Sequence, residues 1–262
     1  MVKTEKEIIE MYTKLENSFV ILNEKSEEFG IAEGGILPIS ENIYTELKQA
    51  NEILYEFNLF KRKTQEVKLN YQSILDSENE WTSVLTDNKG DSSTLFQEQI
   101  FIDVNRRVSN FIVSLKSLVD DLLIKHKLPS IFGNDAVEHF KKKVSSWYDT
   151  KLSYKFFIRL RDFAVHYDLP IQIVSFSYDY DEERDSQIQV QFEIKFRKET
   201  LLNNSTFDSK LGLDLKLYNN TFPLMPFLEE IEFIFDEILK AIISISDSRY
   251  MKACLLYTSR CV

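Results

Sequence analysis

The chain has 262 residues, 44% of them hydrophobic and 28% charged, a balance typical of a globular protein with a substantial core. Its formal net charge of −10 argues against a broad basic surface for nucleic acid, while a small cationic site on an acidic body stays compatible. No apolar run has the length of a membrane span and the N-terminal residues lack the apolar region of a secretion signal, so we expect a cytoplasmic protein.

Composition and periodicity predict a mainly α-helical fold. The chain has 20 phenylalanines and 12 tyrosines but only 6 glycines and 5 prolines, which favours long helices with few tight turns. Apolar residues at helical spacing predict a first helix over 4–29 and, after a break rich in glycine, a second over 40–85. The polar stretch 87–93 predicts a linker, so we assign 1–86 to an N-terminal helical region.

A third long helix is predicted over 94–127. Its apolar stripe alternates steps of four and three residues and comprises Val104, Val108, Phe111, Leu115, Leu118 and Leu122. Such a stripe is typical of a buried helix face and implies no chemistry. Further helices are predicted over 135–148 and from about 150 to just before Pro170, and we assign 94–171 to a helical core.

After Pro170 the pattern changes from the helical period to an alternation of apolar and polar residues. Residues 171–178 and 187–196 alternate apolar and polar side chains, as strands with one wet face do. The polar stretch 179–186 between them predicts a turn, so the sequence predicts a β-hairpin at about 171–197.

The last predicted element is a helix at the C-terminal end. Residues 203–205 predict a loop, and Pro223 or Pro226 opens a helix that continues through Ile242. We assign 172–253 to a hairpin and a C-terminal helix that pack on the helical core.

Residues 254–262 resemble a translated transposase adapter from sequencing libraries. The codons TGT CTC TTA TAC ACA TCT encode Cys-Leu-Leu-Tyr-Thr-Ser, and the inverted element AGA TGT GTA TAA encodes Arg-Cys-Val and a stop. We expect a non-native tail, with native sequence missing after residue 253; the alternative is a native tail. Both cysteines, Cys254 and Cys261, then belong to the tail, so we expect neither disulfides nor thiolate metal sites.

The hexapeptide Arg161–His166, Arg-Asp-Phe-Ala-Val-His, is the most informative stretch of the chain. It lies near the end of the helix predicted before Pro170. Histidine side chains exchange protons near neutral pH, and an arginine stabilises negative charge that grows on a phosphate. These residue types therefore suit RNA cleavage by attack of a ribose 2′-hydroxyl on the adjacent phosphate.

An arginine followed directly by a polar residue, with a histidine five positions on, resembles the R-x4-6-H motif of the HEPN superfamily. The resemblance covers about 94–171 and includes Leu169-Pro170-Ile171, with Asp162 where uncharacterised bacterial HEPN-like proteins have asparagine. HEPN domains are compact helical bundles, and many are metal-independent ribonucleases of toxin and antiphage systems. The resemblance thus implies a HEPN-like bundle that cleaves RNA without cofactor, as a toxin or abortive-infection effector with a neutralising partner.

The resemblance implies that Arg161, His166 and Asp162 are catalytic, with Asp162 orienting an arginine or histidine across a cleft shared by two protomers. Arg161 lies about 140° around an ideal helix from His166, whereas Arg159 is seven residues away and close to the same face. Because the family's polar residue directly follows its arginine, as Asp162 follows Arg161, we favour Arg161 and assign Arg159 to substrate binding as a second cation.

The family usually pairs two protomers across one cleft, which implies a homodimer. Asn105, Arg106 and Asn110, on the preceding helix, are candidate substrate-binding residues of that cleft; the alternative is a solvated helix flank. A second interpretation makes the chain a non-catalytic HEPN-like interaction or scaffold protein, in which the motif is ordinary helix-end electrostatics.

Overall fold

The computed structural model of the chain describes residues 29–32, 35–38, 41–87, 93–123, 134–180 and 188–260. These residues form a mainly α-helical fold with a small antiparallel sheet, which confirms the predicted fold class. Strands β1 (Phe29–Ala32) and β2 (Gly35–Pro38) pair as a hairpin where the sequence predicted only a break. The expected helix over 4–29 lies outside the described residues except for Phe29, which begins β1.

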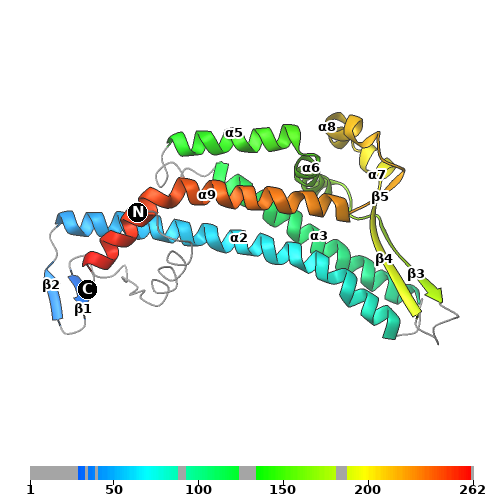
Figure 1. Ribbon diagram of the computed structural model, residues 1–262, viewed down its shortest axis with the longest axis horizontal. Helices are drawn as coiled ribbons and strands as arrows, with labels where there is room; N and C mark the ends of the chain where they lie inside the picture. Colours follow the sequence, from blue (N-terminus) through cyan, green and yellow to red (C-terminus); the bar gives the residue numbers. More distant parts are fainter. Residues whose placement is uncertain are drawn as a thin grey trace.

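Three long helices form the elongated body of the molecule (Figure 1). They are α2 (Glu41–Asp87), α3 (Thr94–Leu123) and α9 (Met225–Arg260), and α3 and α9 both run back along α2. The predicted stripe of α3 is confirmed as core, since five of its members are buried: Val104, Val108, Phe111, Leu115 and Leu118. Pro226, in the first turn, opens α9, because Pro223 instead ends strand β5 (Thr221–Pro223).

Helix α9 continues through most of the tail that the sequence marked as adapter-like. Cys254 is buried in a small cluster with Ala50, Leu54, Tyr250 and Ala253. Burial raises the pKa of the Cys254 thiol, as expected for a thiol that packs as a small apolar side chain. The non-native origin of this segment stays a prediction.

Helix α6 (Leu152–His166), which carries the hexapeptide, packs against four other helices. It follows α5 (Asn134–Thr150) after Lys151 alone and contacts α3, α5, α9 and α8 (Ser205–Leu215). Lys151 offers no side-chain cap, and the Oε2 atom of Glu230, on α9, accepts a 3.0 Å hydrogen bond from the Ser153 amide instead. Both predicted helices are confirmed, and α6 ends shortly before Pro170, as the proline requires.

The predicted β-hairpin is confirmed as β3 (Ile173–Tyr180) and β4 (Ile188–Arg197), paired antiparallel. The sequence missed the third strand, β5, which adds to the far edge of β4. The predicted loop at 203–205 is wrong at Ser205, where α8 begins, and the short helix α7 (Lys198–Leu202) precedes it.

The core of the molecule is rich in phenylalanine and centres on Phe156 of α6. Five rings, contributed by α6, β4, α8, β5 and α9, lie with their centroids 4.5 to 6.0 Å from the Phe156 ring: Phe157, Phe196, Phe207, Phe222 and Phe227. One large cluster of buried side chains includes these rings and extends to Val67 of α2.

A half-buried polar network joins α2 to α3. The Asp103 carboxylate accepts hydrogen bonds from Trp81 Nε1 at 3.1 Å, Arg106 Nη2 at 2.6 Å and Arg107 Nε at 2.7 Å. Arg107 also donates to the backbone oxygen of Ser73 at 2.7 Å. Burial alone would raise the pKa of Asp103, but the three hydrogen bonds and the charge of Arg107 together hold that pKa below its ordinary value.

We predict that Asp103→Asn lowers the free energy of unfolding by about 1 to 3 kcal/mol at neutral pH, because charge-assisted hydrogen bonds are lost. The pKa of Asp103 is lower in the folded protein than in the unfolded chain. Its contribution to the free energy of unfolding is therefore complete above the ordinary carboxyl pKa of about 4, and it is lost as pH falls through the lower pKa of the folded state. The free energies of unfolding of the wild type and the variant, measured by urea titration, should therefore converge as pH falls through the native pKa of Asp103.

Glu98→Gln is the matched control, since Glu98 is an exposed carboxylate on the same helix. It should leave the free energy of unfolding within about 0.5 kcal/mol of the wild type across this range. A loss for Asp103→Asn that stays constant from neutral to acid pH would contradict the role of its charge.

Candidate functional site

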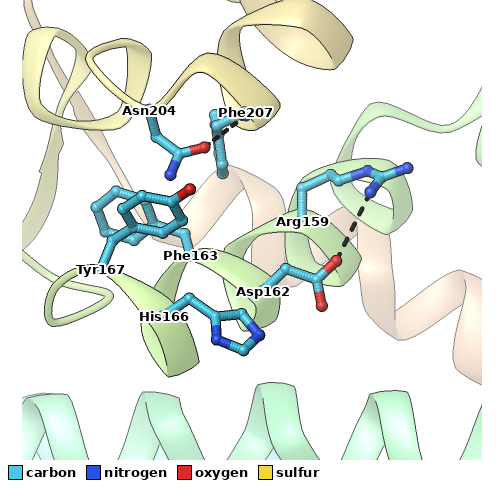
Figure 2. Close-up of a pocket in the computed structure, with 7 residues that line it drawn as sticks. All are labelled: Arg159, Asp162, Phe163, His166, Tyr167, Asn204 and Phe207. Atoms are coloured by element: carbon cyan, nitrogen blue, oxygen red, sulfur yellow. Dashed lines mark hydrogen bonds and ion pairs between the residues drawn. The ribbon is translucent and has the colours of Figure 1, made fainter.

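Three polar side chains of the last turns of α6 share one pocket. Arg159, Asp162 and His166 are three and four residues apart, which places them on one face of the helix. The pocket has a volume of about 380 Å³ (Figure 2). Its other lining residues, from α6, its C-cap and the start of α8, are Phe163, Tyr167, Asn204 and Phe207.

Arg159 is the arginine that the structure brings into the pocket with His166. Its Nε donates a 2.6 Å hydrogen bond to the Tyr148 hydroxyl, and its guanidinium carbon lies 5.4 Å from the centre of that ring. Its Nη1 lies 3.6 Å from Asp162 Oδ2. Tyr148 on α5 and Asp162, one turn further along α6, thus both hold the guanidinium, and these two contacts limit the rotamers of Arg159.

Arg161, the arginine favoured by the sequence motif, does not line this pocket. Its Nη1 donates to Asp162 Oδ1 at 3.2 Å, so the Asp162 carboxylate lies between the two arginines. This arrangement follows from helix geometry, because residue 159 is nearly in line with residue 166 whereas residue 161 is not.

His166 is the last residue of α6 and its side chain is exposed. Figure 2 shows its ring on the same side of the helix as the Asp162 carboxylate. The backbone N–H of Tyr167 closes the helix on the Phe163 carbonyl at 2.9 Å, which fixes the direction of the chain beside the imidazole. The imidazole is therefore open to a bound molecule and stands on a hydrogen-bonded turn.

The opposite wall of the pocket is aromatic and includes one buried amide. The rings of Phe163 and Tyr167 stack with 6.2 Å between centroids and 17° between planes. Asn204 caps α8, since its Oδ1 accepts a 2.8 Å hydrogen bond from the Phe207 amide. Its Nδ2 is buried and has no hydrogen-bond partner among the described residues.

Sequence reasoning missed this wall and Tyr148. The available signal is Asn204 itself, because asparagine is among the preferred N-cap residues, although the polar residues 203–205 also fit the predicted loop. Nothing local in the sequence shows that α8 packs beside the end of α6.

The three candidates on α3 do not line the pocket. Asn105 is buried, donates to the Phe101 carbonyl at 3.0 Å and accepts from the Ile171 amide at 2.9 Å, so both ends of its amide are used within the chain. Arg106 is exposed and pairs with Asp103, and Asn110 is an exposed position on the same helix. The alternative of a solvated flank describes Arg106 and Asn110, whereas Asn105 fixes the backbone after Pro170.

Comparison of the chain with protein-family models, curated proteins and solved structures found no match. Among the residues described by the structure, no group of three or more His, Cys, Asp or Glu side chains is placed to hold a metal ion. In the same described residues, every helix is too short or too polar to span a lipid bilayer.

We predict that Asn105→Ala lowers the free energy of unfolding by about 1 to 3 kcal/mol, because the buried Ile171 amide loses its acceptor. Asn110→Ala is the matched control on the same helix and should change the free energy of unfolding by less than about 0.5 kcal/mol. Chemical denaturation of both variants measures the difference, and equal effects would contradict the structural role of Asn105.

Proposed function

We propose that this chain is a metal-independent endoribonuclease of the HEPN type, with its active site in the pocket at the end of α6. The observation that best supports the proposal is that Arg159, Asp162 and His166 occupy one face of α6 and one pocket. A cation and an exposed imidazole in one pocket supply charge stabilisation and proton transfer, the two kinds of assistance that RNA cleavage by transesterification uses.

The proposed reaction uses the ribose of the RNA as its own nucleophile. His166 accepts the proton of the 2′-hydroxyl while O2′ bonds to the adjacent phosphorus. The bond from phosphorus to O5′ breaks, and O5′ takes a proton from the second copy of His166 in the homodimer that the resemblance implies. The products are a 2′,3′-cyclic phosphate and a 5′-hydroxyl.

Arg159 is the proposed stabiliser of the charge that grows on the phosphate oxygens. Its guanidinium is held by Tyr148 and Asp162 before any substrate binds, so little reorganisation is needed during the reaction. Asp162 positions this cation and Arg161, and we assign it no proton transfer.

The proposal fits the acidic balance of the whole chain. With a net charge of −10, general attraction to phosphates is weak, so RNA has to be recognised by specific groups in the pocket. Uncontrolled cleavage of cellular RNA arrests growth, which fits a cytoplasmic toxin or antiphage effector with a neutralising partner protein.

We predict that the purified chain cleaves single-stranded RNA in the presence of EDTA. Arg159→Ala and His166→Ala should each reduce the rate by at least about 100-fold, because they remove the charge stabiliser and the proton-transfer group. Arg161→Ala, the matched arginine control outside the pocket, should keep the rate within about 10-fold. A 5′-hydroxyl end accepts a phosphate from polynucleotide kinase without prior dephosphorylation, and a 2′,3′-cyclic phosphate resists phosphatase until acid opens the ring, so these two treatments identify the product ends.

Several outcomes separate the alternatives. Cleavage that EDTA abolishes, or products with 5′-phosphates, would contradict the proposed chemistry. Loss of activity in Arg161→Ala but not in Arg159→Ala would return the catalytic role to Arg161. Absence of cleavage by the folded wild type, with no growth arrest on expression in a bacterial host, would favour the interaction-protein alternative.

A further inference from the structure

The amide of Asn204 presents a hydrogen-bond donor that the protein itself does not use. Asn204 is 6% exposed, and its Nδ2 has no partner in the part of the chain that the structure describes. Buried polar groups in folded proteins are nearly always hydrogen-bonded, so this donor needs an explanation. Figure 2 shows the nitrogen pointing toward the paired rings of Phe163 and Tyr167, inside the pocket.

The orientation of this amide is fixed by the helix that it caps. The Phe207 amide donates to the side chain of Asn204 at 2.8 Å, which requires the oxygen at that position. A flipped amide would place a donor against a donor and leave α8 uncapped. Asn204 therefore offers the pocket a donor only, and the group that meets it has to be an acceptor.

Tyr167 provides a flat surface beside this donor. Its ring stacks on Phe163, which is buried, and Tyr167 itself is 63% exposed. A planar heteroaromatic ring can therefore add to the stack from the solvent side. Tyr167 and His166 both line the pocket, so a ring bound on Tyr167 shares the pocket with the imidazole.

The pocket divides into a charged half and an aromatic half. Figure 2 shows Arg159 and Asp162 on one side of the pocket, and Asn204 with the two stacked rings on the other. A phosphate fits the half that holds the cation. The aromatic half, with one donor, fits an uncharged planar group that carries an acceptor.

We infer that Tyr167 and Asn204 form a subsite for the nucleobase of the nucleotide whose ribose is attacked at His166. Tyr167 stacks on the base, and Asn204 Nδ2 donates to a ring nitrogen or carbonyl oxygen on its edge. The inference rests on the proposed function for the identity of the ligand, and it adds how one nucleotide of the RNA is held.

The test is binding of 3′-mononucleotides of the four bases, and of ribose 5-phosphate, to the full chain by calorimetry. At least one mononucleotide should bind about 10-fold tighter than ribose 5-phosphate, which has no base. Asn204→Ser keeps an oxygen for the α8 cap but removes the amide donor, and Tyr167→Leu removes the ring. Each should weaken mononucleotide binding about 10-fold while leaving ribose 5-phosphate unchanged.

Two variants serve as checks on this comparison. Asn204→Asp also keeps the cap but turns an acceptor toward the base, so it should weaken mononucleotide binding more than Asn204→Ser does. Tyr55→Leu is the matched control for Tyr167→Leu, since Tyr55 is 61% exposed and lies on α2, outside the pocket lining. It should bind every ligand as the wild type does.

The outcomes distinguish the subsite from the ribonuclease proposal. Equal affinity for mononucleotides and ribose 5-phosphate, or unchanged mononucleotide binding in folded Asn204→Ser and Tyr167→Leu, would overturn the subsite even if RNA is cleaved. Base-dependent binding that both variants weaken, with no RNA cleavage by the wild type, supports a nucleobase subsite at Tyr167 and Asn204 but overturns both the ribonuclease proposal and the assignment of the bound base to an attacked nucleotide.

Discussion

The packing of the Phe156 ring is the interaction on which the site depends. Aromatic rings from four other elements surround it at centroid distances of 4.5 to 6.0 Å, several of them edge to face. Phe157, the next residue, packs edge to face on Phe111 of α3 at 5.3 Å. Neighbouring side chains thus anchor α6 on two sides, which leaves little freedom for the helix to rotate.

This packing reaches the pocket directly through Phe207. The same ring lies 5.7 Å from Phe156 and 6.0 Å from Phe163, and it lines the pocket. The position of Asn204 follows, because it caps the helix that carries Phe207. The core and the site are therefore one packed unit.

The sequence predicted the parts of the fold that have a long, regular period. Helices α2, α3, α5, α6 and α9 and the hairpin β3–β4 repeat their apolar residues often enough for the period to be recognised. Strand β5 has three residues and α7 has five, so neither contains enough positions to establish a period. Packing against β4 and α8 determines these elements, and such contacts are not local in sequence.

The candidate site was predictable on α6 and not beyond it. Helix geometry alone indicated Arg159, whereas the family pattern indicated Arg161, and the pocket contains Arg159. Asn105 looked like a cleft residue because a polar side chain near an apolar stripe suggests function. Its partner, the Ile171 amide, is 66 residues away along the chain, and that contact is not visible in the sequence.

The hydrogen bond from Ser153 to Glu230 has a consequence for the order of folding. The residue that ends α6, Pro170, is close to the helix in sequence. The start of α6 is instead stabilised by the carboxylate of Glu230, which lies 77 residues after Ser153 in the chain. Short helices without such support are marginal in water, and contacts that close long loops form slowly. We therefore expect the helix that carries the site to become firmly fixed only once α9 has been synthesised and has docked, which would keep the pocket incomplete on the ribosome.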